Sequence, residues 1–135
     1  MKKLYSYTFI LFILMSLQSC YKDVGPIEGE TDVPAEGISY SQDVQPIYDQ
    51  NCISCHPNSG DLDLTAGNSY AQTVNANASG YAGKLVVPGD PENSILYKKI
   101  DGSGAYGSNM PLGSSLSQTQ INTIKQWIEE GAENN

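Results

Sequence analysis

Cys52, Cys55 and His56 form the pattern C-x-x-C-H in the middle of this chain. Two thiols separated by two residues can add to the two vinyl groups at one edge of a porphyrin. The next residue is then held beneath the iron, where an imidazole nitrogen can ligate it. The pattern therefore predicts one covalently bound haem c, with thioether bonds at both cysteines and His56 as the proximal iron ligand.

Two other kinds of site compete with this interpretation. A C-x-x-C pair also forms redox-active disulfides, but such a site belongs in a βαβ context, which this sequence lacks. Structural zinc takes four ligands. Cys52, Cys55 and His56 supply three, and the only other cysteine is Cys20. Zinc and a disulfide remain alternatives, and haem attachment is favoured over both.

The other axial ligand of such a haem can be sought by elimination. His56 is the only histidine, so two histidine ligands within one chain are impossible. Met110 is the only methionine after Met15 and lies in a glycine-rich stretch, residues 102–113, just before Pro111. A methionine can instead fill a gap in a core. Its place in a Gly/Ser loop before a proline favours the distal ligand.

Helices are predicted where a capping residue precedes apolar residues spaced three and four apart. The first is expected over residues 39–51 and leads directly into the C-x-x-C-H pattern. Others are expected over residues 90–102 and 117–131, with a shorter helix over 69–74 and a brief extended piece over 84–87. The sequence therefore predicts a small all-α domain with long, Gly-rich loops.

The N-terminal segment has the features of an export signal. Lys2 and Lys3 precede a mostly apolar run over residues 4–17, which is shorter than the ~20 residues of a membrane-spanning helix. The run ends in Leu-Gln-Ser-Cys20, which resembles the lipobox of bacterial lipoproteins, where the cysteine becomes the lipidated first residue. We therefore expect a signal peptide over residues 1–19 and a lipid anchor at Cys20. Simple secretion and an uncleaved anchor are the alternatives.

Residues 20–38 are rich in Gly, Pro and acidic side chains and show no apolar period. Such a segment cannot bury enough apolar surface to fold. It is expected to be a flexible tether between the lipidated Cys20 and a folded domain over residues 39–135.

The charge of the chain limits its partners. The net charge of −8 becomes −10 once Lys2 and Lys3 leave with the signal peptide. No basic patch is present to neutralise phosphates, so nucleic acid is not an expected partner. Basic surfaces on other proteins would be attracted by this field.

Seven short motifs run in order through residues 40–132: DVQPI, CISCH, GDLDL, VPGDP, SILY, MP and WIEEGA. With them the chain resembles a mono-haem class I cytochrome c, and most of all the exported domains typified by the planctomycete-type cytochrome c family. The resemblance implies a small cytochrome c fold packed around one haem, with Cys52 and Cys55 attaching it and His56 and Met110 ligating iron. One departure is Leu112, where these domains often carry a second proline.

A haem iron with both axial positions filled by protein has no open site for oxygen or peroxide and passes single electrons. The sequence therefore predicts an electron carrier, not an enzyme, that meets redox proteins at the cell envelope. One alternative is a haem enzyme subunit or haem-based sensor in which Met110 is displaced. Against it, no Arg and no second His is present to assist distal chemistry. A domain dedicated to one enzyme is a further alternative.

Overall fold

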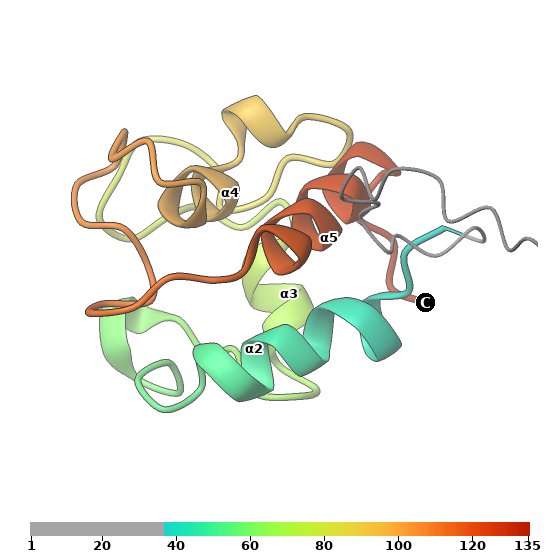
Figure 1. The fold of residues 1–135 in the computed structure, drawn as a ribbon, viewed down its shortest axis with the longest axis horizontal. Coiled ribbons are helices and arrows are strands. Elements are labelled where there is room, and N and C mark those ends of the chain that lie inside the picture. Colours follow the sequence, from blue (N-terminus) through green and yellow to red (C-terminus); the bar gives the residue numbers. More distant parts are fainter. Residues whose placement is uncertain (1–36) are drawn as a thin grey trace, which may run out of the picture. The chain divides into compact units, whose positions relative to one another are not determined.

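The structure is a computed structural model that describes residues 37–135 of the chain. The expected signal peptide, Cys20 and nearly all of the expected tether lie outside these residues. The described part contains no β-strand, and its α-helices are joined by long loops (Figure 1). The all-α class predicted from the sequence is confirmed for this part. Its α-helices are α2 (Gln45–Asn51), α3 (Ser69–Thr73), α4 (Ile95–Ile100) and α5 (Gln118–Glu129).

The first predicted helix begins as expected at Ser39, but its first turn is wider than an α-helix. A π-helical turn, Tyr40–Val44, precedes α2. The Ser39 hydroxyl accepts from the Gln42 amide at 3.3 Å, as a cap should. The Ser39 amide donates to Asp43 Oδ2 at 2.8 Å. In an α-helical capping box the side chain of Gln42 would accept from the Ser39 amide. The π-turn contains one extra residue, and the acceptor is accordingly Asp43, the fourth residue after the cap.

The core lies mainly between α5 and the π-helical turn that precedes α2. The apolar residues expected on the inner faces of the first and last helices are buried, except for Ile121, which is half-buried. Aromatic rings pack together in this core. Tyr40 lies 5.2 Å from Trp127 and 5.1 Å from Tyr70, measured between ring centroids. The buried apolar side chains of this core are those of Ile38, Tyr40, Val44, Ile47, Tyr48, Leu64, Val86, Leu96, Leu116, Ile124, Trp127, Ile128 and Ala132.

The two ends of the described chain are joined by hydrogen bonds. The Ile38 amide donates to Glu130 Oε2 at 2.7 Å, and the Tyr40 amide donates to Asn135 Oδ1 at 2.7 Å. Ile38 is only 3 % exposed, so the core extends one residue into the segment expected to be tether.

The prediction of one helix starting at Asp90 is wrong. Asp90 caps a short 3-10 turn, Pro91–Asn93, and α4 begins only after Ser94. The backbone of Ser94 is extended, and its buried hydroxyl accepts from the Val87 amide and donates to the Asp90 carbonyl, both at 2.8 Å. A serine hydroxyl that bonds to nearby backbone competes with helix formation in this way.

The segment before α4 satisfies the first amides of that helix. The Ile95 amide donates to the Lys84 carbonyl at 3.1 Å, and the Leu96 amide donates to the Leu85 carbonyl at 2.9 Å. The extended piece predicted over residues 84–87 occurs as two isolated bridges, Val74 with Val86 and Asn77 with Lys84. The short helix predicted over residues 69–74 is confirmed as α3.

The last helix matches its prediction. Ser117 and Gln120 form the complete capping box at the start of α5, and Gly131 follows its end with a positive φ of 105°. None of the helices within residues 37–135 is long and apolar enough to cross a membrane.

Candidate functional site

The C-x-x-C-H motif forms a tight turn directly after α2. The Cys52 amide donates to the Tyr48 carbonyl at 2.8 Å and so continues the last turn of the helix. The amides of Cys55 and His56 both donate to the Cys52 carbonyl, at 3.1 and 2.9 Å. The His56 carbonyl accepts from the Leu64 amide at 2.8 Å. The backbone of His56 is therefore fixed on both sides, and one turn of the chain carries both cysteines and His56.

The imidazole of His56 has one nitrogen engaged. Its Nδ1 lies 2.8 Å from the Ser59 carbonyl oxygen. Because a carbonyl oxygen can only accept, the neutral ring must carry its proton on Nδ1. Nε2 then presents a lone pair, which is the form that binds a metal ion, and the hydrogen bond fixes the orientation of the ring.

A left-handed turn brings the following loop back over this ring. Gly60 has φ of 70°, and a Cβ atom added there would lie 4.0 Å from His56 Cε1. Asp61 also has a positive φ, 53°. The turn directs the Ser59 carbonyl toward the imidazole, and a glycine is well suited to it.

The two cysteines are free thiols in different surroundings. Cys52 is half-buried and Cys55 is exposed. Burial raises the pKa of the Cys52 thiol to about 11. Reactive thiols of disulfide oxidoreductases have lowered pKa values and lie at helix N-termini, whereas Cys52 follows the C-terminus of α2. The surroundings of Cys52 therefore differ from those of a redox-active disulfide.

Apolar side chains beside the motif suit a flat apolar group. Cys52, Ile53 and Leu62 are only partly buried and pack against the core. A porphyrin resting on them would cover this surface. Each Å² of apolar surface removed from water would stabilise the bound state by ~25 cal/mol. Free thiols, an available imidazole nitrogen and an apolar margin together fit haem c. Among residues 37–135, no three His, Cys, Asp or Glu side chains gather as a metal site would need.

Met110 lies in the loop between α4 and α5, separate from the motif. It is half-buried, and its amide donates to the Lys99 carbonyl at 2.7 Å. Within residues 37–135, no hydrogen bond joins this loop directly to the C-x-x-C-H turn. Residues 79–81 contact the Met110 loop and the turn at Gly60 that follows the motif: Ser79 Oγ donates to the Gly60 carbonyl at 2.8 Å, and the Tyr81 hydroxyl donates to the Tyr106 carbonyl at 2.6 Å.

In Figure 1 the loop that carries Met110 and the segment after α2 both lie at the left of the view. The loop is orange and the segment is green. The termini of the described chain lie at the right. Both segments expected to contact haem are thus found away from the joined termini.

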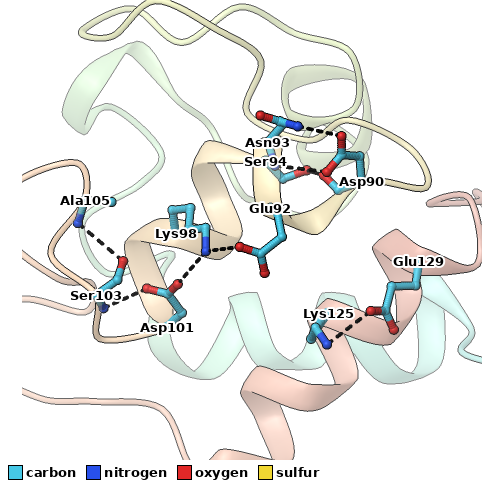
Figure 2. A network of polar contacts seen from close by, with 10 residues as sticks. All are labelled: Asp90, Glu92, Asn93, Ser94, Lys98, Asp101, Ser103, Ala105, Lys125 and Glu129. Atoms are coloured by element: carbon cyan, nitrogen blue, oxygen red, sulfur yellow. Dashed lines mark hydrogen bonds and ion pairs between the residues drawn. The ribbon is translucent and has the colours of Figure 1, made fainter.

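Polar contacts on α4 fix the start of the Met110 loop (Figure 2). Lys98 pairs with Glu92 and, at 3.3 Å, with Asp101. The Ser103 amide donates to Asp101 Oδ1 at 2.8 Å, and the Ala105 amide donates to Ser103 Oγ at 3.3 Å. Burial pushes the pKa of Asp101 up, but the hydrogen bonds from Ser103 and Lys98 outweigh it, so that pKa is lowered overall.

Sequence reasoning named the chemical groups of the site but not their supports. The Ser59 carbonyl, the Lys99 side chain and the Tyr81 hydroxyl were not predicted. Only the glycine at position 60 signals the turn after His56, since a glycine often marks a positive φ. The contacts of Lys99 and Tyr81 join residues far apart in sequence, and no short pattern encodes them.

Comparison with known proteins returns no relative for this chain. No protein-family model matches it, and neither the curated proteins nor the solved structures contain a match.

Proposed function

We propose that this chain is an electron carrier with one haem c bound covalently through the two cysteines of its C-x-x-C-H motif. His56 and Met110 would be the proximal and distal iron ligands. The observation that carries the proposal is the His56 imidazole, whose Nδ1 donates to the Ser59 carbonyl at 2.8 Å. This bond leaves Nε2 free for iron, one residue after the second thiol. A haem iron held by imidazole and thioether passes single electrons with little change of geometry.

On this proposal the domain is a small cytochrome c fold with its helices packed around the haem. Two features support this arrangement. The motif leaves the end of α2 at the margin of the core, and the apolar side chains there are only partly covered. The Met110 loop begins at the end of α4, and its ligand residue is held by the carbonyl of Lys99.

The proposed location is the cell envelope, with the protein facing the periplasm or the exterior. It follows from the expected signal peptide and the lipidated Cys20, which lie outside the described residues. The partners would be redox proteins at the same membrane. The acidic character of the chain, with 15 acidic against 7 basic residues, favours partners with basic docking surfaces.

An optical spectrum of the purified protein in both oxidation states tests the proposal. We expect the bands of a c-type haem, a weak far-red band from methionine sulfur on ferric iron, and slow reaction of the ferrous protein with carbon monoxide. Haem should also resist extraction by acidified acetone, because thioether bonds hold it. Haem that is extracted, or a colourless protein that contains zinc, would contradict the proposal.

Replacing Met110 separates an electron carrier from an enzyme or sensor. Met110→Ala should remove the far-red band, lower the reduction potential and admit cyanide or carbon monoxide to the iron. The direction follows because a thioether favours ferrous iron. Leu112→Ala, two residues along the same loop, is the matched control and should leave the band in place. If unmutated protein already lacks the band and binds carbon monoxide at once, the enzyme or sensor alternative is favoured.

A further inference from the structure

We infer that Lys99 is a positioning residue that holds the Met110 loop closed and so keeps the proposed thioether ligand at the iron. This inference rests on the proposed function, because it concerns access to the same site. Lys99 belongs neither to the C-x-x-C-H motif nor to the Met-Pro pair, so those motifs assign it no role.

The ammonium group of Lys99 lies inside the bend of the loop. Its Nζ donates to the carbonyls of Tyr106 and Ser108, at 2.8 and 3.1 Å. These carbonyls lie four and two residues before Met110. The same nitrogen lies 3.3 Å from the hydroxyl of Tyr81 and 5.0 Å from the centroid of its ring. One cation therefore joins two backbone positions of the loop to a third segment.

The backbone of Lys99 holds the loop as well. Its carbonyl accepts from the Met110 amide at 2.7 Å. Because Lys99 stands in the last turn of α4, its side chain and its carbonyl fix the loop to one rigid turn of helix. Met110 is thus positioned by the same residue that holds the carbonyls before it.

Apart from the Tyr81 hydroxyl, which donates to the Tyr106 carbonyl at 2.6 Å, few contacts restrain this part of the loop. Residues 102–109 are exposed apart from Tyr106, which is half-buried. The Tyr106 ring packs edge-on against Tyr81, with centroids 5.3 Å apart. Inside the loop, the Gly107 amide donates to the Gly104 carbonyl at 3.2 Å, and the Gly104 amide donates to Asn109 Oδ1 at 3.2 Å. A segment with so few buried contacts opens readily. The hydrogen bonds from the charged Lys99 side chain therefore contribute much of the restraint on the loop.

The neighbouring Lys98 has different partners. It pairs with the carboxylates of Glu92 and Asp101 and makes no hydrogen bond to residues 102–113. Because Asp101 in turn accepts from the Ser103 amide, Lys98 acts on the start of the loop, whereas Lys99 bonds directly to the carbonyls just before Met110.

The test uses the haem-loaded protein and the rate at which cyanide binds its ferric iron. Cyanide can bind only when the sulfur of Met110 leaves, so the rate reports how often the loop opens. Lys99→Leu keeps an apolar stem and removes the donors. It should bind cyanide about tenfold faster than the unmutated protein, as expected for losing hydrogen bonds from a charged group. The far-red band should weaken in parallel.

Three further variants make this result specific. Lys99→Arg keeps a cation that can donate to two carbonyls and should restore slow binding. Tyr81→Phe removes only one hydroxyl and should accelerate binding by a smaller factor than Lys99→Leu. Lys125→Leu removes a cation whose partner is Glu129 on α5 and should leave the rate unchanged.

Amide hydrogen exchange gives a second readout that does not depend on ligand binding. The amides of Gly107 and Met110 should exchange faster in Lys99→Leu, while the Ile124 amide in the core of α5 should not change. Unchanged cyanide binding and unchanged exchange would overturn the inference. An unmutated protein without the far-red band would contradict methionine ligation itself, and the exchange data would still decide whether Lys99 holds the loop.

Discussion

The region where the first and last described residues meet contains buried aromatic rings, whereas the loop between α4 and α5 is held mainly by polar contacts. In the first region Trp127 is 1 % exposed and Tyr40 is 5 % exposed. In the second, Leu112 is 68 % exposed. Both regions lie within about 100 residues of chain, yet burial stabilises one and a few hydrogen bonds stabilise the other.

This difference fits the proposed roles of the two regions, in which the aromatic core stabilises the fold and the loop carries the proposed iron ligand. Regions with few buried contacts open locally at low cost, whereas a core opens only when the domain unfolds. A loop that carries the proposed iron ligand must be fixed well enough to hold it, and Lys99 supplies fixed contacts without burial. The expected consequence is that substitutions in the aromatic region change stability, while substitutions in the loop change access to the proposed site.

The largest effect on stability is expected from Trp127→Ala. The ring contacts Tyr40 and Tyr70, and its Nε1 donates to the Glu133 carbonyl at 2.9 Å. Removing a buried ring of this size costs about 3–5 kcal/mol, which is much of the stability of a small domain. Thermal unfolding followed by circular dichroism measures it. Leu112→Ala is the control in the other region and should change stability by less than about 0.5 kcal/mol. Equal losses in both variants would contradict the comparison.

Tyr40→Phe should have the next largest effect. The buried Tyr40 hydroxyl donates to Ser69 Oγ at 2.6 Å, and Ser69 donates to Gln45 Oε1 at 2.5 Å. Without the hydroxyl, Ser69 loses a partner where water does not reach. We expect a loss of about 1–3 kcal/mol in the free energy of unfolding, measured by denaturant titration. A loss below the error of that titration would show that this buried network contributes nothing.

A smaller, pH-dependent effect is expected from Asp101→Asn at the start of the loop. The pKa of Asp101 is lowered in the folded protein. A lowered pKa means that its carboxylate stabilises the fold above about pH 4, its unfolded value, and that this is lost as pH falls through the folded value. Asp101→Asn should therefore be less stable than the unmutated protein at neutral pH, by about 1 kcal/mol or less. The difference should shrink below pH 4. A difference that is constant from pH 7 to pH 2 would contradict this role.

Tyr48→Phe should have the smallest effect. Tyr48 is 1 % exposed, and its hydroxyl is buried with no hydrogen-bond partner among the described groups. Removing an unpaired buried hydroxyl should leave stability unchanged or slightly higher. The same denaturant titration as for Tyr40→Phe gives a direct comparison of two buried tyrosines. A clear loss would mean that the hydroxyl has a partner in the folded protein.

The sequence predicted the helices best where a cap and an apolar period agreed. The capping box at Ser117 and the apolar spacing after it placed α5 correctly. At Asp90 the same kind of signal marked a 3-10 turn, because Ser94 hydrogen-bonds to Val87 and delays the helix. That contact depends on a segment seven residues earlier folding back, which a local pattern does not encode.

The site divides in a similar way. Cys52, Cys55, His56 and Met110 could be proposed as site residues from residue type and spacing alone, because their chemistry is unusual, and their roles stay predictions. The structure brings the first three into one turn and places Met110 in a separate loop. Their supports, such as the Ser59 carbonyl and the Lys99 side chain, could not be predicted, since backbone carbonyls and lysines are common and only distance gives them a role.

The most direct test of the account is the mass of the peptide that contains residues 52–56, isolated from purified protein after full denaturation. Covalent attachment predicts a peptide heavier by one haem, with that mass retained after treatment with a thiol reductant, because thioether bonds are not reduced. The single variants Cys52→Ala and Cys55→Ala should each leave at most one bond to haem. A peptide with two unmodified thiols, or with a disulfide that the reductant opens, would contradict covalent haem attachment.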